Sequence, residues 1–324
     1  MAIQIIKAGI MDSFQDSGRK SLAHLGINRS GVMDEYHAAI ANALAGNPPH
    51  FALLEMGFPA ATIRFERNIF FALSGGDFDA HLDGKQLKIH QPAHAKAGSL
   101  LVFKNPVSGR WIYLAVKGGF HIEKILGSFS TNLKGRFGGW KGRKLETGDQ
   151  IELAANHLEE QKPGPNFFIQ KSEFETEPVA LLPGPEFDVL SGDAKQQLFH
   201  SAWNISAGSD RMAYKLVGEI LQTTRGGEML SAPVTRGTVQ VLPSGDIMVL
   251  MADHQTIGGY PRIGQLTASD FYRFAQWSGK IALQFKKTTM DEALRKYKDE
   301  QAKINKRLAA IKLHLHCNQS SFDE

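Results

Sequence analysis

The stretch FDAHLDGKQLKI, residues 78–89, gives the clearest fold signal in the chain, because Asp83-Gly84 lies between two short strand-like runs. A type I′ turn needs positive φ at both central residues, which Asp-Gly tolerates, so the stretch predicts an antiparallel β-hairpin. Other runs of strand length, rich in β-branched or aromatic residues, lie on both sides of it. They are residues 62–65, 69–73, 100–103 and 111–116, and farther along 237–242, 247–251 and 281–286.

Three segments predict helices. Residues 33–44 are expected to form a helix that Asp34 can cap and that Gly46-Asn47-Pro48-Pro49 ends. A second helix is predicted over residues 268–276. Residues 291–315 contain no Gly or Pro and are rich in Ala, Leu and Lys, which predicts a long amphipathic helix. This last helix can pack on the rest of the chain or pair with another chain, which leaves a homo-oligomer open.

A polar segment divides the chain. Residues 156–176 contain Pro163-Gly164-Pro165 and predict a linker. The predicted domains are an N-terminal β domain over residues 1–165 and a C-terminal β domain over residues 178–288. A helical tail, residues 289–324, follows them. The predicted fold class is therefore mainly β with a few helices.

Composition and charge argue against several classes of protein. The 324 residues carry a net charge of +4, and the basic residues form no known nucleic-acid-binding motif, so no nucleic-acid partner is expected. No apolar run approaches the roughly 20 residues that cross a bilayer, so no membrane span is expected. The one cysteine, Cys317, rules out an internal disulfide, and the N-terminus lacks a signal-peptide pattern, which together predict a cytoplasmic protein.

Six blocks rich in polar residues and glycine stand out in a sequence that lacks the common catalytic motifs. They are residues 13–19, 28–34, 118–119 with 127–131, 138–143, 209–216 and 253–261. Each block alone also fits a structural role, such as a turn, a helix cap, a bulge or a buried ion pair. No metal site is expected, because Pro92 lies between His90 and His94 and argues against a helix that carries both rings on one face.

Taken together, the blocks predict one polar site for a small amide or acid. Arg19 and Arg211 can each bind a carboxylate through two parallel N–H bonds, and Gln255 can donate to and accept from an amide. The candidate catalytic residues are Asp16, Asp34, Asp210 and Arg211, and the general base among the three aspartates is left open. The candidate substrate-binding residues are Gln15, Arg19, Ser30, Met33, Ser130, Thr131, Met212, Tyr214, Gln255, Gly258, Gly259 and Tyr260.

The same blocks carry a family pattern, in order, over about residues 5–288. The matching stretches are QDSGR at 15–19, SGVMD at 30–34, ANALAGNP at 41–48, LLEM at 53–56, YLAVKGGF at 113–120, GSFST at 127–131, GGWKGRKLETGD at 138–149, LPGPE at 182–186, SDRMAYKL at 209–216 and DHQTIGGYP at 253–261. Here the sequence resembles the allophanate hydrolase subunit 2 family, also called KipA-like proteins, which are cyclophilin-like biotin-dependent carboxyltransferases. The resemblance implies two cyclophilin-like β-barrel domains plus the C-terminal helix, and an active site near a subunit 1, or KipI-like, partner.

The resemblance also implies a function. It is closest to the 5-oxoprolinase branch of the family, which implies an ATP-hydrolysing amidohydrolase subunit that converts 5-oxo-L-proline to L-glutamate. The implied partners are the KipI-like B subunit and a LamB/YcsF-type A subunit of that enzyme. The chain has neither an ATP motif nor a biotin-acceptor motif, so ATP is expected to be bound by the complex and biotin only by a partner. Two alternatives stay open: a carboxyltransferase subunit of a biotin-dependent urea or amide carboxylase, and a regulatory protein that binds a KipI-like kinase inhibitor.

The sequence departs from the family pattern at several positions, including the place before LPGP, where the family often has Arg and this chain has Ala180 and Leu181. Phe129 and Lys215 stand where the family often has Arg, and Ala213 stands where it usually has Gly. Lys215 supplies a positive charge but not the planar fork of a guanidinium. The resemblance therefore leaves the ligand of this chain open.

Overall fold

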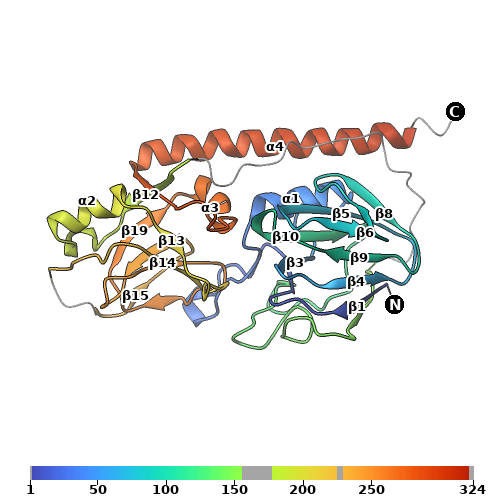
Figure 1. Cartoon of the computed structure of the whole chain (residues 1–324), viewed down its shortest axis with the longest axis horizontal. Coiled ribbons are helices and arrows are strands. Elements are labelled where there is room, and N and C mark those ends of the chain that lie inside the picture. The colour runs from blue at the N-terminus through green and yellow to red at the C-terminus, as the bar shows by residue number, and fades with distance from the viewer. Residues whose placement is uncertain (1, 155–176, 225–228, 321–324) are drawn as a thin grey trace. The chain divides into compact units, whose positions relative to one another are not determined.

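The computed structural model describes residues 2–154, 177–224 and 229–320 (Figure 1). The chain divides into two compact units that do not follow the chain order. Unit 1 consists of Met1–Arg19, Asp34–Ser172 and Lys303–Glu324, and unit 2 consists of Lys20–Met33 and Glu173–Ala302. The expected domain ranges placed residues 20–33 with the first domain, whereas these residues belong to unit 2. The predicted linker over 156–176 lies outside the described residues.

Unit 1 contains two antiparallel sheets. One sheet has the strand order β11-β1-β4-β9-β6-β7, and the other has the order β2-β3-β10-β5-β8. The strands are β1 (Ile3–Lys7), β2 (Ser13–Gln15), β3 (Leu53–Gly57), β4 (Thr62–Phe65), β5 (Ile69–Asp77), β6 (Ala80–Leu82), β7 (Lys85–Gln86), β8 (Pro92–Ala95), β9 (Leu100–Phe103), β10 (Ser108–Val116) and β11 (Gln150–Ile151). The predicted runs 62–65 and 100–103 match β4 and β9, and those at 69–73 and 111–116 form parts of longer strands.

The predicted hairpin is confirmed at its turn. Asp83 and Gly84 have φ values of 51° and 79°, as a type I′ turn requires, and His81 pairs with Gln86. The second strand is shorter than predicted, because β7 ends at Gln86. The chain then leaves the sheet, and the backbone N–H of His90 donates to the carbonyl of Leu73 on β5.

The core of unit 1 is aromatic and aliphatic, with Phe65 and Phe71 stacked at a centroid separation of 5.0 Å. Helix α1 (Glu35–Leu44) packs on β5 and β10 (Figure 1). Its predicted cap is confirmed, since a carboxylate oxygen of Asp34 accepts from the backbone N–H of His37 at 3.0 Å. The helix buries one face over the sheet and so covers the polar residues that β3, β5 and β10 present on that side.

Unit 2 is built on a seven-stranded sheet with the order β13-β14-β17-β16-β19-β12-β20, in which only the β12–β20 pairing is parallel among the described strands. A small two-stranded sheet, β15-β18, completes the described part. The strands are β12 (Val179–Pro183), β13 (Asn204–Ile205), β14 (Ala213–Val217), β15 (Ala232–Pro233), β16 (Thr238–Val241), β17 (Ile247–Leu250), β18 (Ile257–Gly258), β19 (Arg262–Leu266) and β20 (Phe285–Lys287).

The helices of unit 2 were predicted in part. Helix α3 (Ala268–Ala275) is confirmed, but α2 (Gly192–His200) was not predicted, since it is short and begins with Gly. Ser191 caps α2 by accepting from the backbone N–H of Ala194 at 3.2 Å. The strand predicted over 281–286 is shorter and lies later in the chain, since β20 covers Phe285–Lys287. Leu283, before it, pairs with Trp203 in an isolated bridge. Two short 3-10 turns are η1 (Ala23–Leu25) and η2 (Phe187–Val189).

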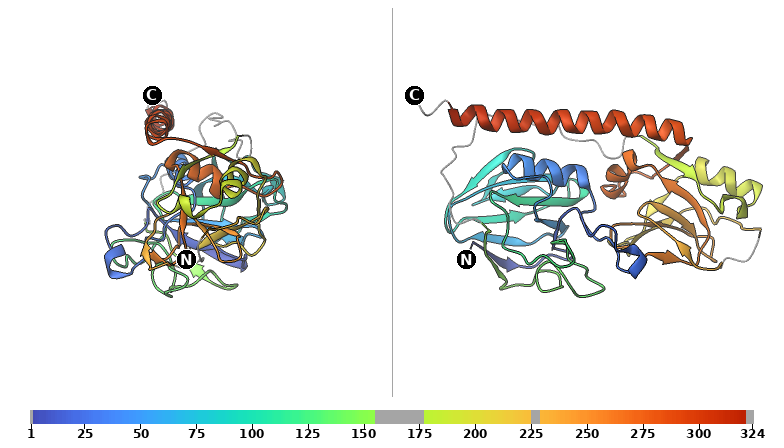
Figure 2. Two further views of the ribbon diagram at one scale, coloured as in Figure 1. Left: turned by 90° about the vertical axis from the view of Figure 1, so that its left-hand side faces the viewer. Right: turned by 180° about the vertical axis from the view of Figure 1, so that it is seen from behind.

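The C-terminal helix α4 (Met290–Ser320) is one uninterrupted helix, longer than predicted at both ends (Figure 2). Its residues up to Ala302 belong to unit 2, and those from Lys303 onward belong to unit 1. Within unit 1, Ile311 is 1% exposed, so this part of the helix packs on the β domain. The chain is thus mainly β with a C-terminal helix, as predicted. Over the residues described above, none of the helices is long and apolar enough to cross a membrane.

Candidate functional site

Asp16 is the centre of a hydrogen-bonded cluster in unit 1. It follows β2 directly, and its carboxylate accepts from Ser128 Oγ and Ser130 Oγ at 2.6 Å each. It also accepts from the backbone N–H groups of Gly18 and Phe129 at 2.8 Å each. The residue is 7% exposed. Four donors therefore fix Asp16, and the loop that carries GSFST is folded around it.

The neighbouring candidates of the same block join this cluster. Arg19 is buried, donates to the carbonyl of Ser130 at 2.6 Å, and lies over the ring of Phe137 at 4.5 Å. Gln15 Nε2 donates to the carbonyl of Thr131 at 3.2 Å. Gly138 has a φ of 70°, and a Cβ there would lie 2.2 Å from Arg19 Nη2, so only glycine allows this approach. The structure thus brings Gln15, Asp16, Arg19, Ser130 and Thr131 together within unit 1.

Asp34 lies in a different cluster of unit 1, beneath α1. Besides capping the helix, its carboxylate lies 2.5 Å from His37 Nδ1, and its backbone N–H donates to the hydroxyl of Tyr113 at 2.8 Å. Burial raises the pKa of Tyr113 well above its ordinary value, and the negative charges of Glu55 and Asp34 raise it further. Asp34 is fully buried, which argues against its predicted role as a catalyst in contact with substrate.

This buried cluster contains residues that sequence reasoning missed. Glu55, Tyr113 and Ser74 lie side by side on β3, β10 and β5, since Tyr113 pairs with both of the others. Ser74 Oγ lies 3.0 Å from His90 Nδ1. A Glu, a Tyr and a Ser inside otherwise apolar strands were the available signal. The strand register needed to place them side by side could not be read from the sequence.

Asp12, which directly precedes the first block, is a buried carboxyl group of unit 1 with a shifted pKa. Burial raises its pKa to about 7, against the backbone N–H groups of Gly9 and Ala61 and the charge of Lys144, which lower it. The unfolded chain keeps the ordinary pKa of 3.8. The stability that the neutral carboxyl contributes is therefore fully present below about pH 4 and is lost as the pH rises through about 7.

The substitution Asp12→Asn is expected to remove this pH dependence, whose slope is about 1.4 kcal/mol per pH unit inside the window. The measurement is urea unfolding of both proteins at several values from about pH 4 to 8. The variant should gain stability relative to the wild type as the pH rises, until the difference levels off above about pH 8. A difference that stays constant across the whole range would contradict the assignment.

Arg211 is the centre of the cluster in unit 2. Its guanidinium bonds the carboxylate of Asp253 through Nε at 2.9 Å and Nη2 at 3.1 Å. Nη2 also donates to the carbonyl of Gly31 at 2.6 Å, and the side-chain amide of Asn28 donates to the carbonyl of Asp253. Both ions are almost fully buried. The pair therefore attaches the segment 28–33 to the end of β17.

Gln255, two residues after Asp253, lies near a second carboxamide, that of Gln240. A Cβ at Gly258 would lie 2.9 Å from Gln240 Nε2 and 3.4 Å from Gln255 Nε2, so both side chains reach the same glycine. Within the described part of the chain, the Oε1 atoms of Gln240 and Gln255 are buried and have no hydrogen-bond partner. Gln240 is fully buried and Gln255 is half-buried, so Gln255 is the better placed of the two to meet an N–H donor of a ligand.

His254 lies near charges of both signs. Burial lowers its pKa and the guanidinium groups of Arg236 and Arg29 lower it further, whereas the hydrogen bond to the backbone of Gln255 and the charge of Asp253 raise it. Its Nδ1 lies 2.5 Å from the carbonyl of Gln255. A neutral imidazole beside two guanidinium groups suits a ligand that carries a negative charge. Sequence reasoning had not selected Asp253, His254, Arg29, Arg236 or Gln240, although the first three lie in quoted blocks.

The remaining candidates have local structural roles. Asp210 is exposed and accepts from the backbone N–H groups of Met212 and Ala213, which is a turn stabilised by its own side chain. Tyr214 is fully buried and donates to the carbonyl of Ala275, so it belongs to the core of unit 2. Ser30 and Met33 are buried, Met212 and Tyr260 are half-buried, and Gly259 accepts from the backbone of Met229.

Asp16 and Arg19 thus belong to unit 1, and Arg211 and Gln255 belong to unit 2. Over residues 2–154, 177–224 and 229–320, no group of three His, Cys, Asp or Glu side chains could hold a metal ion. What the arrangement offers is hydrogen-bonding groups and positive charge, which suit a small, polar, anionic amide.

Several known proteins are similar to this chain. The family model described as "Carboxyltransferase domain, subdomain A and B" matches residues 25–287. The chain is 35% identical to the C subunit of 5-oxoprolinase from Escherichia coli (strain K12), over 92% of this chain and 95% of that protein. It is 29% identical to urea amidolyase of Saccharomyces cerevisiae, over 96% of this chain but 18% of that protein. The crystal structure of the K. lactis urea amidolyase has the same fold, with a TM-score of 0.84 at 22% identity, over 94% of this chain and 20% of that chain.

Proposed function

Since the chain belongs to the carboxyltransferase subdomain A and B family, we propose that it is one component of an ATP-dependent 5-oxoprolinase, which converts 5-oxo-L-proline to L-glutamate. The observation that carries the proposal is the similarity to the C subunit of the E. coli enzyme, which extends over nearly the full length of both proteins. Its partners are a KipI-like B subunit and a LamB/YcsF-type A subunit. ATP is bound by the assembled complex, because this chain carries no ATP motif.

The cluster around Gln255 has the chemistry that 5-oxoproline requires. The substrate carries a lactam N–H, a lactam carbonyl and a carboxylate. The Oε1 atom of Gln255, which has no hydrogen-bond partner among the described residues, suits the lactam N–H. The positive charge of Arg29 and Arg236, which acts on His254, suits the carboxylate. In this proposal the chain binds and orients the lactam, and the ATP-dependent activation of its carbonyl takes place in the complex.

The proposal is tested by co-expressing the chain with its KipI-like and LamB/YcsF-type partners and measuring ATP-dependent release of glutamate from 5-oxoproline. In this complex Gln255→Leu should lower kcat/KM by roughly 10- to 100-fold, since one hydrogen bond to the substrate is lost. The matched control is Gln222→Leu, which changes an exposed glutamine of the same unit. Absence of glutamate release from the wild-type complex would overturn the proposal.

A second candidate is a carboxyltransferase component of a biotin-dependent urea or amide carboxylase. The similarity to urea amidolyase over 96% of this chain favours it. The same co-expressed complex distinguishes the two functions. This candidate predicts carboxylation of urea or another amide and a biotinylated partner that avidin detects, without release of glutamate from 5-oxoproline.

A further inference from the structure

Residues 121–144, between β10 and β11, form a basic segment of unit 1, which Figure 1 shows in green as loops outside the two sheets. The segment contains one acid, Glu123, and six basic residues, which are Lys124, Lys134, Arg136, Lys141, Arg143 and Lys144. Its net charge is therefore +5, whereas the whole chain has a net charge of +4. The rest of the chain together carries −1, so the positive excess of this protein is concentrated in one stretch.

Three of these cations are available to a partner. Lys124, Arg136 and Lys141 are exposed, and none of them is in an ion pair with another residue that the structure describes. Arg143 differs, because its guanidinium donates to both carboxylate oxygens of Asp149 at 2.7 Å each. A partner that binds the three exposed cations therefore breaks no ion pair within the described part of the chain.

The backbone of the basic segment is folded into three short turns. A backbone hydrogen bond of 2.9 Å closes each of them, and they span residues 125–128, 132–137 and 138–142. Lys124 directly precedes the first turn. Arg136 and Lys141 lie in the other two, with left-handed φ values of 54° and 55°. A Cβ at Gly142 would lie 2.2 Å from the carbonyl oxygen of Arg136, so the second and third turns are in contact.

The buried Arg19 joins the turns to one another. Its guanidinium donates to the carbonyl of Ser130, just after the first turn, at 2.6 Å. A Cβ at Gly138, where the third turn begins, would lie 2.2 Å from Arg19 Nη2 and 2.3 Å from the same carbonyl oxygen. The turns therefore form one packed surface before any partner binds, which lowers the entropic cost of binding.

Apolar groups accompany the cations. Lys124 Nζ lies 5.4 Å from the ring centroid of Phe129, and Lys141 Nζ lies 5.2 Å from that of Trp140. Both rings are half-buried and pack against the core of unit 1. Leu126 is 51% exposed in the first turn. Basic and aromatic residues on a surface of fixed shape are typical of protein–protein interfaces.

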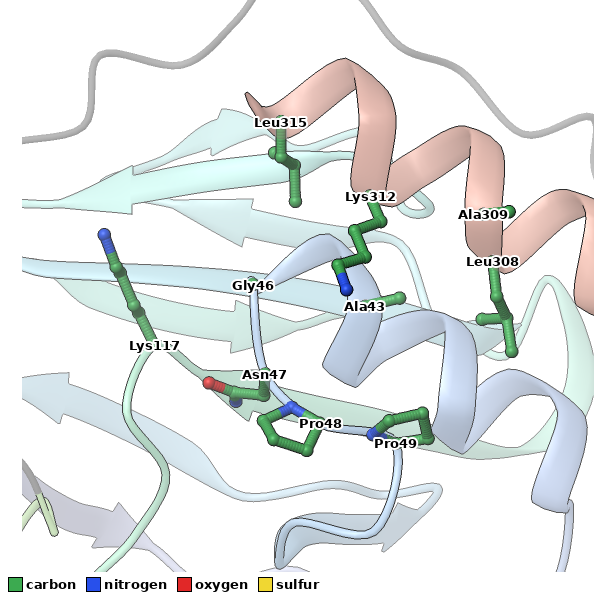
Figure 3. Close-up of a pocket in the computed structure, with 10 residues that line it drawn as sticks. All are labelled: Ala43, Gly46, Asn47, Pro48, Pro49, Lys117, Leu308, Ala309, Lys312 and Leu315. Carbon is green, nitrogen blue, oxygen red and sulfur yellow. The ribbon is translucent and has the colours of Figure 1, made fainter. Parts of the chain in front are cut away.

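The same contacts favour an acidic protein surface over a nucleic acid. Proteins that bind single strands offer open aromatic faces on which bases stack. Here Phe129 and Trp140 are half-buried, and each already faces a lysine. The surface is also separate from the pocket of about 610 Å³ between α1 and α4, since none of the ten lining residues that Figure 3 draws belongs to the basic segment.

From these observations we propose that residues 121–144 are the surface on which an acidic face of the KipI-like B subunit docks. The inference rests on the proposed function for the identity of the partner, and it adds the place and the chemistry of the contact. The exposed cations attract the acidic face and raise the association rate constant, kon, in a salt-dependent manner. The packed turns give the docked subunit a surface of defined shape.

The test is biolayer interferometry of the full chain with the purified KipI-like subunit, at about 50 and about 500 mM NaCl. The triple variant Lys124→Glu with Arg136→Glu and Lys141→Glu should lower kon about tenfold or more at the lower salt concentration and lose most of the salt dependence. The matched control reverses three exposed lysines of unit 1 outside the segment, namely Lys88→Glu, Lys96→Glu and Lys104→Glu. Each reversal lowers the charge by two, so both variants have a net charge of −2. The control should keep kon within about threefold of the wild type.

A neutral variant separates loss of the surface from loss of the fold. Lys124→Gln with Arg136→Gln and Lys141→Gln should give a kon between those of the wild type and the charge-reversed variant. Circular dichroism and urea unfolding should be the same in all four proteins, because the changed side chains are exposed. Equal kon values for the two charge-reversed variants, or no binding of the wild type to the KipI-like subunit, would overturn the proposal.

Two further outcomes have distinct meanings. Binding of a single-stranded RNA of about 20 nucleotides through these cations, with an unchanged kon for the KipI-like subunit, would mean a nucleic-acid surface, and the proposal would fall. Glutamate release by the three-component complex with an unchanged kon would overturn the docking surface and leave the proposed function in place. The expected change in kon without any glutamate release would support the docking surface and overturn the proposed function.

Discussion

Replacing Arg211 with alanine is expected to lower the free energy of unfolding by about 3–5 kcal/mol, because the change leaves the carboxylate of Asp253 buried without its cation. The two ions are 2% and 7% exposed, and two N–H groups of Arg211 bond the carboxylate. The same guanidinium holds Gly31, so the segment 28–33 should lose its attachment as well. The measurement is urea unfolding, with hydrogen exchange in β14 and β17 to locate the loss in unit 2.

Two further variants serve as controls for the stability loss expected of Arg211→Ala. Arg262→Ala breaks an ion pair with Glu186 whose partners are each 21% exposed, and it should cost about 1 kcal/mol or less. The double variant Arg211→Met with Asp253→Leu should recover much of the loss, because no unpaired charge remains. If Arg211→Ala unfolds like the wild type while the complex loses activity, Arg211 acts on the substrate, as its sequence block first suggested.

The elements that could be predicted from the sequence are those that local chemistry decides. The turn at Asp83-Gly84 needs only residues that tolerate positive φ, and the cap of α1 needs only Asp34 and the N–H three residues later. Helix α2 was missed although Ser191 provides the same kind of cap, because the helix is short and begins with Gly192. The parallel β12–β20 pairing joins residues about 105 positions apart, which no local pattern encodes.

The candidate site shows the same limit. Within each unit, residues of blocks far apart in sequence meet through long-range contacts, such as Asp16 with Ser128 and Ser130. Sequence blocks identified these groups but not their partners, so Asp253 was missed even though Arg211 was selected. Asp34 and Tyr214 also show that a residue in a family block can lie entirely in the core. Residue type predicts chemistry, whereas burial decides which side chains reach a ligand.

Asp16→Ala is expected to lower the free energy of unfolding by about 3 kcal/mol or more, since hydrogen bonds to a charged group contribute about 1.5–3 kcal/mol each and are not additive. The change leaves the hydroxyls of Ser128 and Ser130 and two backbone N–H groups without their acceptor. Urea unfolding measures the loss. The control is Asp210→Ala, whose exposed carboxylate accepts two backbone N–H groups, and a cost of about 1 kcal/mol or less is expected there.

Asp16→Asn then separates a structural role from a catalytic one. The amide oxygen of Asn can still accept from some of these donors, so the variant should lie between the wild type and Asp16→Ala in stability. If Asp16 only shapes the GSFST loop, glutamate release by the complex should fall with the loss of folded protein and no further. A variant that folds as well as the wild type but releases no glutamate would contradict this view. It would return Asp16 to the role of proton carrier, because an amide cannot replace a carboxylate in proton transfer.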